Sequence, residues 1–236
     1  MTSFFIFDFK FKSVKLRNIV LLILLILVAD QGLKVWVKTS MYYHEEFKIA
    51  GNWFRLFFIE NEGMAYGWSF GGEWGKLLLT LFRFVAVVAG TWYLKRIVEQ
   101  QYHKGFIICA ALIYAGALGN LIDSMFYGLL FTGSEPGAPL ATMFPEQGYA
   151  GFFHGKVVDM LYFPIIENKI MPSWVPVIGG EPFTFFQPIF NIADASISTG
   201  IIAILIFQKR FFPSEKQEEG KTVETNAKVS DDSQVL

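Results

Sequence analysis

The chain has 236 residues, of which 53% are apolar, 17% aromatic and only 17% charged. Soluble domains usually have about a quarter of charged residues, so the composition excludes an ordinary water-soluble domain and indicates an integral membrane protein. Its 20 basic and 21 acidic residues give a net charge of −1, which leaves no basic surplus for binding nucleic acid. The single cysteine, Cys109, excludes an intramolecular disulfide.

Four apolar stretches approach the ~20 residues that a helix needs to cross the hydrocarbon core of a bilayer. They cover about residues 18–37, 77–94, 105–122 and 188–207. The sequence therefore predicts an all-α integral membrane fold with four transmembrane helices. An even number of spans places both termini on the same side of the membrane.

The basic residues indicate which side that is. Residues 1–17 contain four Lys and Arg residues and the 95–104 connector contains three, whereas residues 124–187 contain only Lys156 and Lys169. In membrane proteins the short cytoplasmic segments are the basic ones. We therefore expect both termini to be cytoplasmic. The two long loops, 38–76 and 124–187, are then expected to face outward.

The sequence divides into three parts. Residues 1–17 form a cytoplasmic N-terminus, residues 18–212 a four-helix membrane domain, and residues 213–236 a polar cytoplasmic tail that we expect to be disordered. Partial alternation of apolar and polar residues over 52–60 predicts a small β-rich element in the first outer loop. The second outer loop is enlarged. Aromatic residues crowd both loops, which favours contact with lipid headgroups.

Carboxylates and amides lie where the spans reach the outer side. Asn120 and Asp123 end the third span, and Asn191 and Asp194 begin the fourth, so each pair lies at i,i+3 on one helix face. Because the third span runs outward and the fourth inward, both pairs lie at the same membrane edge. Asp159 is a further acid, in the unusually apolar run VVDMLYF.

A carboxylate inside a span costs about 2.5 to 3.5 kcal/mol on insertion scales, so each one is a candidate functional group. Each also has a structural explanation: Asp194 as a helix cap, Asp123 as a bridge between helices, and Asp30 as the partner of Lys34 at i,i+4. Two carboxylates that share a partly dry pocket cannot both ionise easily, so one can act as general base and the other as general acid. The residues alone do not choose among Asp123, Asp159 and Asp194.

Intramembrane acids also mark ion and proton paths, so a small transporter or channel subunit is the main alternative. That function requires acids through the depth of the membrane, whereas the inner halves of these spans are almost free of them. A non-catalytic scaffold would leave the clustering of acids unexplained. The three histidines form no metal-ligand pattern, and we expect neither a metal nor a cofactor.

Five ordered motifs resemble those of the lipoprotein signal peptidase (signal peptidase II) family of intramembrane aspartic peptidases. They are DQGLK from Asp30 to Lys34, NEGMAYG from Asn61 to Gly67, GALGNLID from Gly116 to Asp123, VVD from Val157 to Asp159, and PIFNIAD from Pro188 to Asp194. The motifs occur in the family's order and together reach across most of the chain.

The resemblance implies an endopeptidase that removes the signal peptide from a prolipoprotein, cutting on the N-terminal side of the lipid-modified cysteine. It implies that Asp159 and Asp194 form the catalytic pair. Asp194, near a helix N-terminus, is then expected to ionise more readily, and Asp159, among apolar residues, to hold its proton longer. The other matching positions have supporting or substrate-binding roles: Asp123, Asn120, Asn191, Asp30, Lys34, Asn61 and Gly63.

The resemblance also implies a location and partners. The protein is expected in the bacterial cytoplasmic (inner) membrane, with its active site at the outer, periplasmic face. Its partners are then the lipid-modified prolipoprotein and membrane lipid. Nothing in the sequence demands a second copy, so we expect a monomer.

Two features depart from the family pattern. Ser124 stands where the family usually has an arginine directly after the NLID acid, so any contact of that arginine must come from elsewhere. The stretch between Asp123 and Asp194 is also longer than the family pattern, with additional residues around 129–150 and 164–187. We expect these Gly-, Pro- and aromatic-rich segments to form an extra outer lid.

Overall fold

The computed structural model describes residues 14–62, 72–176 and 179–212. Gly63, most of the N-terminal segment and the tail 213–236 lie outside the described residues, as do the expectations attached to them.

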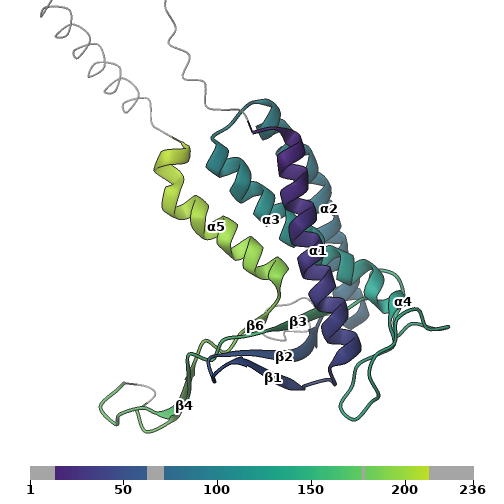
Figure 1. Ribbon diagram of the computed structural model, residues 1–236, viewed down its shortest axis with the longest axis vertical. Coiled ribbons are helices and arrows are strands. Elements are labelled where there is room, and N and C mark those ends of the chain that lie inside the picture. Colours follow the sequence, from purple (N-terminus) through teal and green to yellow (C-terminus); the bar gives the residue numbers. More distant parts are fainter. Residues whose placement is uncertain (1–13, 63–71, 177–178, 213–236) are drawn as a thin grey trace, which may run out of the picture.

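The described residues contain four long helices (Figure 1): α1 (Leu16–Ser40), α2 (Gly72–Glu99), α3 (Lys104–Ile122) and α5 (Ile192–Phe211). α3 continues through a π-helical segment, η2 (Asp123–Tyr127), into the short α4 (Gly128–Leu130). With that extension all four are long and apolar enough to cross a membrane, which confirms the four predicted spans. Many of their apolar side chains are exposed, as expected of helices that face lipid.

The buried face of α1 shows how the helices position polar groups. Its buried residues follow the helical repeat in one stripe: Ile19, Ile23, Asp30, Lys34, Val37 and Lys38. Ile19 and Ile23 belong to an apolar cluster among the helices, and Val37 belongs to a second apolar cluster against the strands. Asp30 and Lys34 therefore lie between two apolar layers.

An antiparallel sheet closes one end of the helices (Figure 1), in the order β1 (Glu46–Ala50), β2 (Phe54–Asn61), β3 (Val157–Tyr162) and β6 (Ile189–Phe190). A second pair of strands, β4 (Ile166–Ile170) and β5 (Pro182–Phe185), lies within the second loop. The sequence predicted strand structure only in the first loop, so the all-α description was incomplete. The start of α1, the α2–α3 connection and the end of α5 lie at the opposite end from the sheet (Figure 1).

The fourth helix begins later than predicted. The sequence placed its start at residue 188, whereas Ile189 and Phe190 pair with β3 and α5 begins at Ile192. Asn191 ends the strand because it caps the helix: its Oδ1 accepts a hydrogen bond from the Asp194 N–H at 2.9 Å, and the Asp194 carboxylate accepts from the Asn191 N–H at 3.4 Å. This capping box satisfies two backbone donors at the helix start.

The burial of β3 fixes the direction of its one carboxylate. Val157 to Met160 are all buried, and Val158 and Met160 belong to the apolar cluster that includes Leu56 and Phe58 of β2. Since side chains alternate along a strand, Asp159 points to the opposite face from Val158 and Met160. A carboxylate from the second loop is thereby directed away from the apolar cluster.

Candidate active site

Lys34 lies at the centre of a buried polar network. Its Nζ is 2.9 Å from Asp30 Oδ2 and 2.8 Å from Asp123 Oδ2, and it donates to Asn120 Oδ1 at 3.0 Å. The lysine and both carboxylates are almost completely buried. An ammonium group has three protons, so these three acceptors use its full donor capacity.

Asp30 joins α1 to the start of α5. Besides Lys34, its carboxylate accepts a hydrogen bond from the Ala193 N–H at 2.9 Å. The first N–H groups of a helix have no partner within the helix, so Asp30 completes the hydrogen bonding of the first turn of α5. That is the turn from which Asp194 projects.

Asp123 interacts with three donor groups that come from two other elements, α1 and β3. Gln31 Nε2 donates to its Oδ1 at 2.8 Å, and Lys34 and the Val158 N–H, at 3.4 Å, both reach its Oδ2. The carboxylate is fully buried. Asp123 thus ties α1 and β3 to η2, which fits the bridging explanation that the sequence left open.

Asp159 and Asp194 are linked by two asparagines. Asn120 Nδ2 donates to Asp194 Oδ1 at 2.7 Å, and Asn191 Nδ2 donates to Asp159 Oδ1 at 2.6 Å. Asn191 also donates to Asn120 Oδ1 at 3.2 Å and caps the helix of Asp194. The other oxygen of Asp159 accepts from Asn61 Nδ2. The two carboxylates therefore share one amide network.

Burial is the main influence on Asp159, which is 1% exposed. Removal from water, followed by repulsion from the charge of Asp194, raises its pKa from 3.8 to about 7. The charge of Lys34 and the hydrogen bonds from Asn191 and Asn61 oppose that rise. Asp194 is only half-buried, in the first turn of a helix. One acid of the two is thus in a setting that favours the protonated form.

Arg83 of α2, the only charged residue of the predicted span 77–94, reaches the same place. Its Nη1 donates to Ser124 Oγ at 2.9 Å, and Ser124 Oγ in turn donates to the Asn120 carbonyl at 3.0 Å. Gln31 is a second residue that the sequence reasoning missed. Gln31 directly follows Asp30 in the sequence, and that position could have indicated a place in the site.

A model of the signal peptidase II family matches residues 22–210. A lipoprotein signal peptidase of Porphyromonas gingivalis is 47% identical over 191 residues, covering 80% of this chain and 81% of the relative. One from Amoebophilus asiaticus is 38% identical over 192 residues, covering 79% of this chain and 75% of that relative. The chain belongs to the signal peptidase II family.

Two solved structures of a bacterial membrane enzyme share the fold. One has a TM-score of 0.55 at 22% identity and covers 86% of this chain and 95% of its own. The other has a TM-score of 0.52, also at 22% identity, covering 82% and 94%. The resemblance of the five motifs to signal peptidase II is thus confirmed at the level of the family.

The structure brings together all the described residues that the signal peptidase II motifs single out. α1 supplies Asp30 and Lys34, and the other elements supply Asn61, Asn120, Asp123, Asp159, Asn191 and Asp194. Gly63 lies outside the described residues. Within the described ranges, no group of three or more His, Cys, Asp and Glu side chains is arranged to hold a metal ion.

The extra loop of this signal peptidase II chain is joined to the site through a second buried lysine. Lys38 pairs with Glu60 and donates to Ser134 Oγ at 3.0 Å. Glu60 precedes Asn61, the donor to Asp159, and Ser134 belongs to the additional 129–150 segment. A hollow of about 730 Å³ opens beside these groups and is also lined by Lys76, His154 and Lys156.

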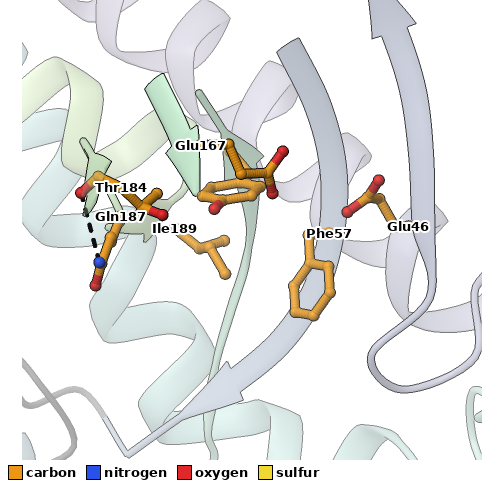
Figure 2. Close-up of a pocket in the computed structure, with 7 residues that line it drawn as sticks. Glu46, Phe57, Glu167, Thr184, Gln187 and Ile189 are labelled. Carbon is orange, nitrogen blue, oxygen red and sulfur yellow. Dashed lines mark hydrogen bonds between the residues drawn. The ribbon is translucent and has the colours of Figure 1, made fainter. Parts of the chain in front are cut away.

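A smaller hollow, of about 410 Å³, lies beside the sheet and has Phe57 and Tyr162 in its lining (Figure 2). Its two carboxylates are already paired: Arg55 Nη1 is 3.3 Å from Glu46 Oε2, and Arg55 Nη2 pairs with Glu167. None of the described site residues lines this hollow. It is therefore separate from the signal peptidase II motifs.

Proposed function

We propose that the chain is an aspartic endopeptidase that removes the signal peptide of prolipoproteins, with Asp159 and Asp194 as the catalytic pair. Membership of the signal peptidase II family supports the substrate. The observation that carries the mechanism is the shared amide network, in which a buried carboxyl with a pKa of about 7 is linked to a half-buried carboxylate at a helix N-terminus. Such a pair divides the roles of acid and base at neutral pH.

The reaction then follows from the two settings. Asp194, whose negative charge is favoured by the α5 dipole, accepts a proton from water while the water oxygen bonds to the scissile carbonyl carbon. Asp159 donates its proton to the carbonyl oxygen, which gives a neutral gem-diol. Asp194 next passes its proton to the leaving nitrogen, the C–N bond breaks, and a gem-diol hydroxyl returns a proton to Asp159. The pair ends in its starting state.

Asp123 is a supporting acid in this proposal. Lys34, Gln31 and the Val158 N–H all hold its carboxylate, so proton exchange there would disturb three contacts. Asn120, Asn191 and Asn61 orient the catalytic carboxyls. Asp30 and Lys34 fix the start of α5 against α3.

The proposal also assigns an orientation. The pair is carried by β3 and by the first turn of α5. These segments lie at the opposite end of the helices from the start of α1 and the end of α5 (Figure 1). With cytoplasmic termini, the pair faces the periplasm from the bacterial inner membrane. The signal helix of the substrate then lies among the transmembrane helices. The scissile peptide bond lies at the level of the sheet, and the lipid of the prolipoprotein stays in the bilayer. Exposed apolar side chains on the second loop, such as Trp174 and Ile170, contact membrane lipid. The proposed working unit is a monomer.

Purified wild type, Asp159→Asn and Asp194→Asn, each incubated in detergent with a diacylglyceryl-modified prolipoprotein, test the proposal. Wild type is expected to release the signal peptide, and both variants are expected to lose at least about 100-fold in kcat because general acid–base catalysis contributes that much. Glu99→Gln, an exposed acid on α2, serves as the matched control. Cleavage by either aspartate variant at the wild-type rate would refute the pair.

A further inference from the structure

Arg83 brings a second cation to the acids of the site. Its guanidinium, on α2, donates to Ser124 Oγ and interacts electrostatically most strongly with Asp194, then with Asp123 and Asp159. These carboxylates come from α5, η2 and β3. The side chain thus reaches across the helix bundle to the place where the three elements meet.

Lys34 alone does not supply the positive charge that Asp159 and Asp194 need beside them. Its three protons are directed to Asp30, Asp123 and Asn120, at 2.8 to 3.0 Å. One ammonium therefore faces two buried carboxylates before Asp159 and Asp194 are counted. A cation beside Asp159 and Asp194 lowers the free-energy cost of keeping one of these two carboxyls ionised in a partly dry site.

The position of Ser124 shows why the cation comes from α2. Ser124 is fully buried, and its hydroxyl lies between Arg83 and the Asn120 carbonyl. In the family pattern an arginine usually follows the NLID acid, at position 124. Here the Arg83 guanidinium lies 2.9 Å from the side chain at that position, so the charge is beside residue 124 although residue 124 does not supply it.

We propose that Arg83 is a positioning residue of this active site: it supplies from α2 the charge that the family pattern places at position 124, and it holds Asp194 ionised while Asp159 keeps the proton. The proposal rests on the proposed function. Arg83 then influences which of the two carboxyls, Asp159 or Asp194, holds the proton.

Variants at position 83 and an exchange of the two side chains test this. Arg83→Gln is expected to lower kcat at least about tenfold with little change in KM. It also moves both the acidic and the alkaline limb of the kcat profile up by about one pH unit, because ionisation of both carboxyls becomes less favourable without the cation. Arg83→Lys, which keeps the charge, retains limbs close to wild type. The double variant Arg83→Ser, Ser124→Arg returns the guanidinium and restores the profile.

The other charged groups around Arg83 are the same in every variant. They are Lys76 on α2, Asp123 on η2, Asp159 on β3 and Asp194 on α5, together with Lys34 of α1, which pairs with Asp123 and Asp30. Arg96→Gln, near the other end of α2, controls for loss of an arginine from this helix. Unshifted limbs in Arg83→Gln, or an exchange variant that does not restore them, would overturn the proposal. Absence of cleavage by wild type would instead refute the proposed function.

Discussion

Asp159 illustrates at the scale of one residue how position determines chemistry. The ordinary pKa of an aspartate carboxyl is 3.8. The pKa of Asp159 is raised to about 7 because β3 buries the carboxyl and Asp194 repels its charge. Within the described residues, the donors to its two oxygens are the side-chain amides of Asn61 and Asn191. Such a group destabilises the fold whenever the pH favours its ionisation, so stability reports on its setting independently of activity.

The sign of that dependence is fixed by the raised pKa. Between about pH 4 and 7 the unfolded chain releases the proton of Asp159 while the folded chain still holds it, so wild type loses stability as the pH rises. Asp159→Asn cannot ionise. Its stability relative to wild type is expected to rise across that range by up to about 4 kcal/mol, and to level off above pH 7. Thermal unfolding in detergent from about pH 4 to 8 measures this.

An asparagine at position 159 would face two amide donors, which costs the variant some stability at every pH. The dependence on pH is therefore the diagnostic quantity. Glu99→Gln, at an exposed site, is expected to show no such slope. A pH-independent difference between Asp159→Asn and wild type would contradict the raised pKa.

At the scale of elements, the close approach of α3 and α5 sets the distance between the Asn120 amide and Asp194. Gly116 makes that approach possible, because a Cβ there would lie 2.2 Å from the Ala193 carbonyl oxygen and 2.7 Å from Ile197 Cγ1. The first contact is with backbone, which cannot rotate away. The close contact between Gly116 and the start of α5 therefore sets the position of Asp194 relative to the Asn120 amide.

Gly116→Ala is therefore expected to push the start of α5 away from α3 and to lengthen the hydrogen bond from Asn120 to Asp194, now 2.7 Å. We expect a loss of about 1 to 3 kcal/mol in stability and a fall in kcat of about tenfold or more. Gly32→Ala is the matched control, because a Cβ there has nothing within 4 Å. That variant should keep wild-type activity and gain up to about 1 kcal/mol. Equal behaviour of the two variants would show that the α3–α5 contact does not position Asp194.

At the scale of the whole molecule, the sequence predicted what depends on local spacing. Apolar length gave the four spans, and the NxxD spacing put Asn191 in contact with Asp194 of the same motif, whereas the Asn120 amide donates to Asp194 of the other motif. Contacts between distant segments were out of reach: Asn61 and Asp159 are 98 residues apart, and Arg83 meets Ser124 over 41 residues. The resemblance, not the spacing, chose Asp159 over Asp123. The geometry adds a physical reason, since Lys34 and Gln31 already hold Asp123.

The arrangement of the whole molecule predicts which loops are accessible from each side of the membrane. Cys109 is the single cysteine and is buried, so a Cys109→Ser background removes it at little cost. In that background, Glu135→Cys in the loop after α4 and Glu99→Cys at the last residue of α2 place thiols at exposed sites. α4 and the α2–α3 connection lie toward opposite ends of the bundle (Figure 1).

A membrane-impermeant maleimide added to intact spheroplasts is expected to label the thiol at position 135 and to leave that at position 99 unlabelled until the membrane is permeabilised. The positive-inside rule predicts this order, because Lys95, Arg96 and Lys104 lie at the α2–α3 connection. Labelling in the reverse order would place Asp159 and Asp194 at the cytoplasmic face. That result would put the pair at the face opposite to the proposed one, so the order of labelling decides the proposed orientation.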